Sequence, residues 1–371
     1  MKRALCLLGG GAMGAMFQIG ALAALEDTVE GFQVNDFDLF LGSSAGASLA
    51  AGLAGGQPVQ RIYRSFLDPA DVYFGLERSH LLRADMAEWR RTVVSAVVAL
   101  RYGVSSLLSG KTSKLPERLA QEVDRLYDSL PAGIFSLEGY ERFLEAFFVR
   151  RGVPNAFSDM PRALRIVAHD LDSGEPVAFG APGFEQASVA RACIASMAIP
   201  PLFSPVRLGD RHYISSGSAE VEQLELAVSE GADVLVVVRP MVAISGASTI
   251  PTGHGERDSL RDKGMMWVFN QARRIGVQRS VEAAIARIRE SGKAEVLLLQ
   301  PQREDGILAM YNPASYDARR GMLEHSYRHT RQVLVRAFAE RHPALSRAGF
   351  VQRVSQSLPP PPPPQLNIEP P

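Results

Sequence analysis

Ser44 stands at the centre of the pattern in this chain that most clearly predicts chemistry. It is the third residue of Gly42-Ser43-Ser44-Ala45-Gly46, a G-x-S-x-G pattern that follows the apolar run 38–42 and precedes a segment of small residues, 47–55. In this order of strand, turn and helix, the pattern holds a nucleophilic serine on a sharp turn, with its hydroxyl clear of the backbone. The spacing therefore predicts that Ser44 attacks a carbonyl carbon, against the alternative of a tight glycine-rich turn with incidental serines.

A second signal is a glycine turn at the end of the first apolar run, 4–8. The segment Gly9-Gly10-Gly11-Ala12-Met13-Gly14 leads from that predicted strand into a predicted helix that ends near Glu26. Backbone N–H groups at such a helix N-terminus point outward and bind an anion or a developing oxyanion. The N–H of Ala45 can join them, so the two turns together are able to stabilise the charge that attack by Ser44 creates.

The same glycine turn has a second interpretation. Gly9, Gly11 and Gly14 match the dinucleotide fingerprint G-x-G-x-x-G, which is a weak signal by itself. Such a site needs an acidic residue at the far end of the second strand to hold the ribose, but Asp36 and Asp38 come at the start of that strand. Nucleotide binding is therefore kept only as a distant third alternative.

No pattern in the chain predicts a metal ion or a cofactor. His325 and His329 are four residues apart on a predicted helix but form no H-E-x-x-H pattern, so we expect them on a solvated helix face. Gly110-Lys111-Thr112 matches the end of a phosphate-binding loop but lacks the first glycine and the preceding strand. Cys6 and Cys193 are too few and too far apart for a disulfide framework or a zinc site.

Short apolar runs alternate with longer segments of helical period. The runs are at 4–8, 38–42, 164–169, 234–238 and 295–300. This alternation predicts an α/β fold with a mainly parallel central sheet and helices on both faces. Between 58 and 151 no convincing strand is found, which predicts a helical insertion. Its helices are expected at 61–66, 86–100, 115–130 and 137–148, and further helices at 258–290 and 317–341.

Three segments together resemble the patatin-like phospholipases: the glycine turn, the G-x-S-x-G turn and the segment Arg191–Phe203, RACIASMAIPPLF. The resemblance covers about residues 4–240 and implies a three-layer sandwich and a lipid acyl hydrolase with a Ser–Asp dyad in place of a triad. It implies that Ser44 is the nucleophile and that residues 196–200 form a wall of the active site. The implied oxyanion hole consists of the N–H groups of Gly9, Gly10, Gly11 and Ala45, and the motif glycines are Gly14, Gly42 and Gly46.

The chain departs from the family where the dyad aspartate should be. The family has Asp-Gly-Gly or Asp-Gly-Ala there, and counting back from Gly231-Ala232-Asp233 puts Ser215 at the aspartate position. Val221-Glu222-Gln223 likewise replaces the family's Asn-x-Pro. A serine hydroxyl is not basic enough to take the Ser44 proton near neutral pH, whereas a carboxylate is. Asp210, the nearest preceding carboxylate, is the candidate for a substitute base, although a place in a β-turn is the more ordinary role for it.

An apolar stretch in the insertion has the character of a membrane contact. Trp89-Arg90-Arg91 precedes the apolar run 93–100, and Arg101-Tyr102 follows it. Cationic and aromatic residues at both ends of an apolar stretch are typical of a lipid interface. We therefore expect a lid or a membrane-docking element, with an ordinary buried helix of the insertion as the alternative.

Composition limits the remaining classes of function. The 371 residues include 40 Lys and Arg and 40 Asp and Glu, and this zero net charge argues against a nucleic-acid-binding surface. No run reaches the roughly 18 apolar residues that span a membrane, and the run 4–8 is too short for a signal-peptide core. We expect a cytoplasmic protein that contacts a membrane surface peripherally and transiently.

These observations predict three parts and one activity. We expect a patatin-like domain over 1–240, a helical extension with one further strand packed on it over 241–354, and a disordered Pro-rich tail over 355–371 that a Pro-binding module could recognise. The predicted function is a serine esterase of phospholipase A type that cleaves acyl esters of phospholipids or other membrane lipids through acyl-Ser44. The alternative is a catalytically impaired relative that binds lipid or a protein partner, which the serine at 215 favours.

The missing aspartate leads to a first prediction. Loss of general-base assistance lowers a rate by about 10²–10⁴, so Ser215→Asp should raise the turnover of simple esters unless another carboxylate has taken over. High native activity that collapses in Asp210→Asn would identify that carboxylate as the substitute. A folded Ser215→Asp variant with no gain in turnover and no fluorophosphonate labelling of Ser44 would contradict the hydrolase hypothesis.

Overall fold

The computed structural model describes residues 1–76, 130–215, 217–245, 259–305 and 315–353. Between 76 and 130 it also describes 78–81, 83–86, 89–90, 92–94, 97–98 and 101. The Pro-rich tail, the segment 110–112 and, apart from Leu130, the predicted helix over 115–130 fall outside these residues.

All five apolar runs form strands of one sheet. They are β1 (Arg3–Leu7), β2 (Leu39–Gly42), β5 (Ala163–Asp170), β9 (Val234–Val238) and β10 (Glu295–Leu299). Their order across the sheet is β10-β9-β1-β2-β5, and each is parallel to its neighbours. The predicted α/β fold with a mainly parallel sheet is therefore confirmed.

Three shorter strands extend the sheet beyond β5 in the antiparallel direction. They are β6 (Pro176–Phe179) and β8 (Arg211–Ile214), which pair with β5, and β7 (Val206–Leu208), which pairs with β8. The register pairs His169 with Ile214 near the carboxyl end of β5. Ser215, which follows β8 directly, therefore lies near the edge of the sheet at which the parallel strands end.

Alternate residues of the central strands face opposite layers, as the pleat of a sheet requires. Leu5 and Leu7 of β1 belong to one buried cluster, and Ala4 and Cys6 belong to another on the opposite face. Burial on both faces explains why these strands are continuously apolar in sequence.

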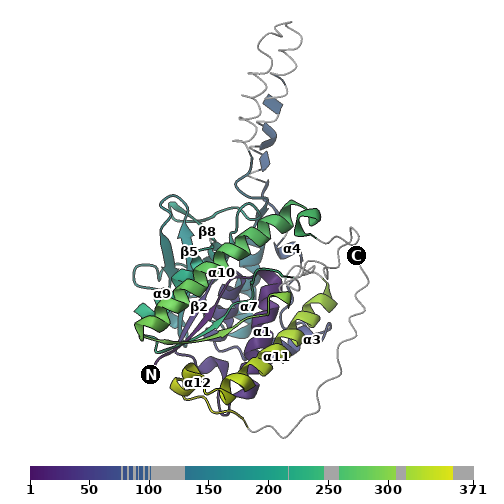
Figure 1. Ribbon diagram of the computed structural model, residues 1–371. Helices are drawn as coiled ribbons and strands as arrows, with labels where there is room; N and C mark the ends of the chain where they lie inside the picture. Colours follow the sequence, from purple (N-terminus) through teal and green to yellow (C-terminus); the bar gives the residue numbers. More distant parts are fainter. Residues whose placement is uncertain are drawn as a thin grey trace.

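Helices cover both faces, so the molecule has the three layers of a sandwich (Figure 1). One face carries α1 (Gly11–Thr28), α2 (Ala45–Ala54), α3 (Val59–Leu67), α7 (Glu138–Arg151), α8 (Val189–Met197), α11 (Tyr316–Ala339) and α12 (Pro343–Arg347). The other carries α9 (Ala219–Ser229) and α10 (Met265–Ser291). Short 3-10 helices lie at Val34–Asp36, Phe157–Asp159 and Leu260–Lys263. Within the described residues, no helix has the length and apolar character needed to cross a membrane.

The insertion differs in one respect from the sequence-based expectation. The predicted helices at 61–66 and 137–148 are α3 and α7, and the described residues of the predicted helix 86–100 are helical. The expectation of no strand between 58 and 151 is wrong, because β3 (Arg83–Ala84) pairs with β4 (Phe135–Ser136) after the short helix α4 (Arg78–Leu81). Strands of two residues are too short to show the alternation by which strands are recognised.

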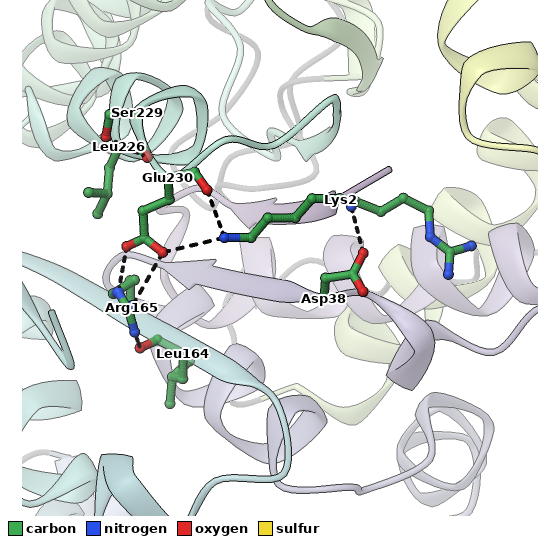
Figure 2. Close-up of polar contacts among 8 residues, drawn as sticks. Lys2, Asp38, Leu164, Arg165, Leu226, Ser229 and Glu230 are labelled. Atoms are coloured by element: carbon green, nitrogen blue, oxygen red, sulfur yellow. Dashed lines mark hydrogen bonds and ion pairs between the residues drawn. The ribbon is translucent and has the colours of Figure 1, made fainter.

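The far end of α9 is tied to the amino end of the sheet by charged groups. Arg165 of β5 donates to both carboxylate oxygens of Glu230, at 2.6 and 3.2 Å, and both side chains are largely buried. Lys2, next to β1, donates to the Glu230 carbonyl oxygen at 2.8 Å. Figure 2 shows these contacts beside Asp38, whose carboxylate accepts a hydrogen bond from the Arg3 N–H at 2.7 Å. Because its last turn is fixed here, α9 has its first turn at the opposite, carboxyl edge of the sheet.

The long helix α11 packs closely along α1. A methyl group on Gly20 of α1 would lie 1.9 Å from the Ser326 Oγ and 2.5 Å from the Leu323 carbonyl oxygen of α11. The Tyr327 hydroxyl of α11 donates to the Asp27 carboxylate at 2.7 Å. The helix that begins at the glycine turn is therefore covered by the C-terminal part of the described chain.

Candidate active site

Ser44 lies in the turn between β2 and α2, at the carboxyl edge of the parallel strands, where α/β proteins bind their ligands. Its backbone has φ +54° and ψ −130°. A positive φ is uncommon for a residue with a side chain and costs of order 1–3 kcal/mol. In the described part of the chain, only Arg341 shares this feature among residues other than glycine. Ser44 thus has the strained strand-to-helix geometry on which a G-x-S-x-G turn depends.

The glycines on either side of Ser44 are required by close backbone contacts. A methyl group on Gly42 would lie 2.6 Å from the Ala47 Cα and 2.7 Å from the Gly46 carbonyl oxygen. A methyl group on Gly46 would lie 2.4 Å from the carbonyl oxygen of Leu7, the last residue of β1. Neither contact leaves room for a side chain, so the turn packs directly against the strand that leads into the glycine turn.

Ser196 of α8 fixes the Ser44 backbone from the other side. The Ser44 N–H donates to the Ser196 Oγ at 2.9 Å, and the Ser196 hydroxyl donates to the Val167 carbonyl oxygen of β5 at 2.6 Å. Ser196 is fully buried. The segment 196–200, expected to form a wall of the site, therefore begins with a residue that contacts the Ser44 backbone.

The glycine turn lies against Ser44. A methyl group on Gly9 would be 3.3 Å from the Ser44 Cβ, and one on Gly10 would be 2.5 Å from the Pro240 Cγ. Gly11 begins α1 with φ +61°. In the part of the chain that the structure describes, the N–H groups of Gly9, Gly10 and Ala45 donate no hydrogen bond. These donors beside Ser44 are free to bind a negatively charged oxygen.

The position of the family aspartate, Ser215, is buried, whereas the candidate substitute base, Asp210, is exposed. Ser215 is buried, and its N–H donates to the Ala198 carbonyl oxygen at 2.8 Å, just beyond the helix whose Ser196 holds Ser44. Asp210 instead lies fully exposed in the turn between β7 and β8, with its carboxylate 3.9 Å from the Arg207 guanidinium. That turn is at the end of β8 remote from Ser215, so its geometry gives no support to Asp210 as a base and agrees with a β-turn role.

Glu220 is the residue at this site that sequence reasoning missed. It belongs to the first turn of α9 and is 2% exposed. A methyl group on Gly9, which would lie 3.3 Å from the Ser44 Cβ, would also lie 3.4 Å from the Glu220 Oε1. The only sequence signal was that Glu220 is the first carboxylate after Ser215 and starts the helix that follows β8.

The surroundings of Glu220 change its acidity strongly. Burial raises the pKa of its carboxyl from 4.5 to about 7, although the positive charges of Arg273 and Arg239 act in the opposite direction. Among the described residues, no group donates a hydrogen bond to its buried Oε2. Arg239 is itself fully buried and binds Glu282 at 3.3 Å and Gln300, so its charge is shared with these partners. The site therefore contains a carboxyl group that ionises near neutral pH.

His325 and His329 contact other polar groups of the described structure. His325 lies 3.4 Å from the Asp305 carboxylate, and the His329 Nε2 contacts the Gln300 carbonyl oxygen at 2.9 Å. Both are partly buried, which corrects the expected solvated helix face, because the periodicity of one helix does not show which other segment packs on it. In the described residues, no cluster of three or more His, Cys, Asp or Glu is able to hold a metal ion.

The buried carboxyl predicts a pH-dependent stability. In the native protein the pKa of Glu220 is about 7, whereas in the unfolded chain it returns to 4.5, so raising the pH between these values favours unfolding. The destabilisation amounts to about 3 kcal/mol and is complete above pH 7. Glu220→Gln should therefore stabilise the protein more at about pH 8 than at about pH 5 in chemical denaturation. The exposed Glu225 of the same helix is the control, and an equal gain for Glu220→Gln at both pH values would contradict the shifted pKa.

Comparisons with known proteins agree with the fold. The model of the patatin-like phospholipase family matches residues 5–221. No protein of curated function matches this chain.

Solved structures are similar only at low identity. VipD from Legionella pneumophila is 14% identical with a TM-score of 0.36, over 92% of this chain and 67% of that one. The type III effector protein ExoU is 17% identical with a TM-score of 0.35, over 90% and 53%. ExoU in complex with SpcU, from the type III secretion system of Pseudomonas aeruginosa, is 14% identical with a TM-score of 0.34, over 94% and 60%. The chain spans about half to two thirds of the length of these proteins.

The family match includes β1 from Leu5 onward, the glycine turn, the Ser44 turn and the start of α9, and it covers more than half of the chain. This chain belongs to the patatin-like phospholipase family.

Proposed function

We propose that this chain is a serine lipid acyl hydrolase that cleaves acyl esters of membrane lipids through an acyl-Ser44 intermediate. The observation that carries the proposal is the strained backbone of Ser44, with φ +54°, in the G-x-S-x-G turn of a chain of this family. Such strain persists only where surrounding contacts hold it, and it is concentrated at functional sites.

The free N–H groups around Ser44 suit acyl transfer. When the Ser44 Oγ attacks an ester carbonyl, the negative charge that develops on the carbonyl oxygen needs preorganised donors. The N–H groups of Gly9 and Gly10 in the glycine turn and of Ala45 next to Ser44 are free of other acceptors in the described residues. Gly9 lies against Ser44, and Gly11 is the first residue of α1. Collapse of the tetrahedral intermediate expels the alcohol of the lipid, and water then releases the fatty acid from Ser44.

The described part of the segment 86–101 supports access to a lipid surface. Val93, Val94, Val97 and Val98 are 46–57% exposed, which does not fit the alternative of an ordinary buried helix. The Trp89 indole N–H donates to the Ile134 carbonyl oxygen at 3.2 Å and ties the base of this segment to the body. Exposed valines beside Arg and Trp are the arrangement of an interfacial helix.

One observation favours a second function. Ser215 occupies the place of the family's aspartate, and a serine supplies no base for Ser44. A protein that keeps the turn and the exposed valines without efficient catalysis would bind lipid, or a protein partner, without hydrolysing it.

Labelling with a fluorophosphonate probe separates these functions. The purified protein should be labelled at Ser44, identified by peptide mass, and should release fatty acid from at least one member of a panel of glycerolipids. Ser44→Ala should lose both labelling and hydrolysis, because the attacking oxygen is removed. A folded wild-type protein that binds the lipids but neither reacts with the probe nor releases fatty acid would support the binding function.

Charge substitution tests the membrane contact. Val94→Asp with Val98→Asp should weaken binding to phospholipid vesicles in a sedimentation assay, because a carboxylate is costly to bury among acyl chains. Val149→Asp, on the exposed side of α7, is the matched control and should leave vesicle binding unchanged. Undiminished binding by a folded double variant would exclude this segment as the contact.

A further inference from the structure

We propose that Glu220 is the general base that activates Ser44, in place of the aspartate that the family carries at the position of Ser215. This inference rests on the proposed function, because it assigns a further catalytic residue to the same acyl-transfer site. Its basis is the placement of Glu220 in the fold.

Glu220 and Ser44 enter one small space from different elements. The missing side chain of Gly9 leaves a position that is 3.3 Å from the Ser44 Cβ and 3.4 Å from the Glu220 Oε1. Ser44 reaches it from the turn after β2, and Glu220 reaches it from the first turn of α9. The nucleophile, a carboxylate oxygen and the glycine turn that binds the oxyanion therefore surround the same point, as a Ser–carboxylate pair requires.

The Glu220 carboxyl has hydrogen-bonding capacity that the protein does not use. Its Oε2 is buried and accepts no hydrogen bond from any described residue. Buried polar atoms nearly always have partners, and an exception calls for a functional or structural explanation. The carboxyl as a whole therefore retains capacity to accept the proton of the Ser44 hydroxyl or of the attacking water during the reaction.

The charges that face Glu220 suit a base at neutral pH. Arg273 reaches it from α10 and Arg239 from the end of β9, and both stabilise the ionised carboxylate, while burial opposes it. The balance gives a pKa of about 7. The glycine turn and the Ser44 turn bring no charged side chain to it. A general base is most effective when its pKa lies near the pH at which the enzyme works.

The other candidates for the general base have unsuitable chemistry or lie in unsuitable positions. Ser215 has no basic lone pair, and Asp210 lies in an exposed turn with Arg207. His169 lies at the same edge of the sheet, but its Nε2 is 3.0 Å from the Ser218 Oγ, and burial lowers its pKa. Glu220 is the carboxylate that the described structure places beside Ser44.

The reaction is balanced with Glu220 as the carrier of one proton. The carboxylate takes the proton of the Ser44 hydroxyl as its Oγ bonds to the carbonyl carbon, and the protonated carboxyl gives that proton to the departing alcohol oxygen as the ester bond breaks. In the second half, Glu220 takes a proton from water as the hydroxide oxygen attacks acyl-Ser44. It then returns the proton to the Ser44 Oγ as the fatty acid leaves.

The pH dependence of ester hydrolysis tests the assignment. With a soluble ester, kcat/KM of the wild-type protein should rise with pH and level off above about 7, since the unprotonated carboxylate is required. Glu220→Gln should lower kcat/KM by about 10²–10⁴ and abolish this rise. Glu225→Gln, the same change at an exposed position of α9, is the control and should retain both the rate and the pH profile.

A measurement on the unaltered protein does not depend on the folding of a variant. The rate of fluorophosphonate labelling of Ser44 should rise across the same pH range, because the probe reacts with the activated hydroxyl. A folded Glu220→Gln variant with wild-type kcat/KM and the same pH profile would overturn the role of Glu220 and leave a Ser44 hydrolase intact. A wild-type protein that neither hydrolyses esters nor reacts with the probe would overturn the proposed function itself, and this inference with it.

Discussion

The close contact between the Gly46 backbone and the Leu7 carbonyl oxygen sets the geometry of the whole site. It brings the turn after β2 against the end of β1, and the glycine turn continues directly from β1. The strained φ of Ser44 is tolerated because its backbone is fixed from both sides, by this contact and by the hydrogen bond to Ser196. Ser44, the proposed nucleophile, and the proposed oxyanion donors of the glycine turn are therefore positioned by backbone contacts, which vary less than side-chain rotamers and suit a preorganised site.

The placement of Glu220 has a different origin. No neighbouring side chain fixes its carboxyl by a hydrogen bond among the described residues; instead the helix that carries it is held in place. The ion pair of Arg165 with Glu230 and the bond from Lys2 fix the last turn of α9, so the first turn lies over the glycine turn. A buried and unsatisfied carboxyl lowers stability, and natural proteins accept such groups mainly where activity requires them. The ion pair at one end of α9 holds the helix in the position that buries the destabilising carboxyl at its other end.

The features that depend on local sequence pattern were predicted from the sequence. Those that depend on tertiary contacts were missed or wrongly predicted. The five central strands and the Ser44 turn were recognised because apolar runs and a G-x-S-x-G spacing are local signals. Glu220 was missed because a glutamate at the start of a helix is ordinary in sequence, and only its position beside Gly9 makes it notable. His325 was expected in solvent because helical periodicity does not show that Asp305 lies next to it. The two-residue strands β3 and β4 were missed because they are too short to form a pattern.

The central position of β1 affects when the site can form. β1 is the first strand in the chain, yet it lies between β2 and β9 in the sheet, and α1 is covered by α11. A chain still being synthesised that has emerged only as far as α8 contains the glycine turn and Ser44 but not α9, β9 or α11. Contacts between such distant segments form late, because the later segment must first be synthesised and the loop between the two segments must close. The arrangement delays completion of the site until α9 and β9 have left the ribosome, so a nascent chain that ends before α9 carries Ser44, the proposed nucleophile, without Glu220, the proposed base.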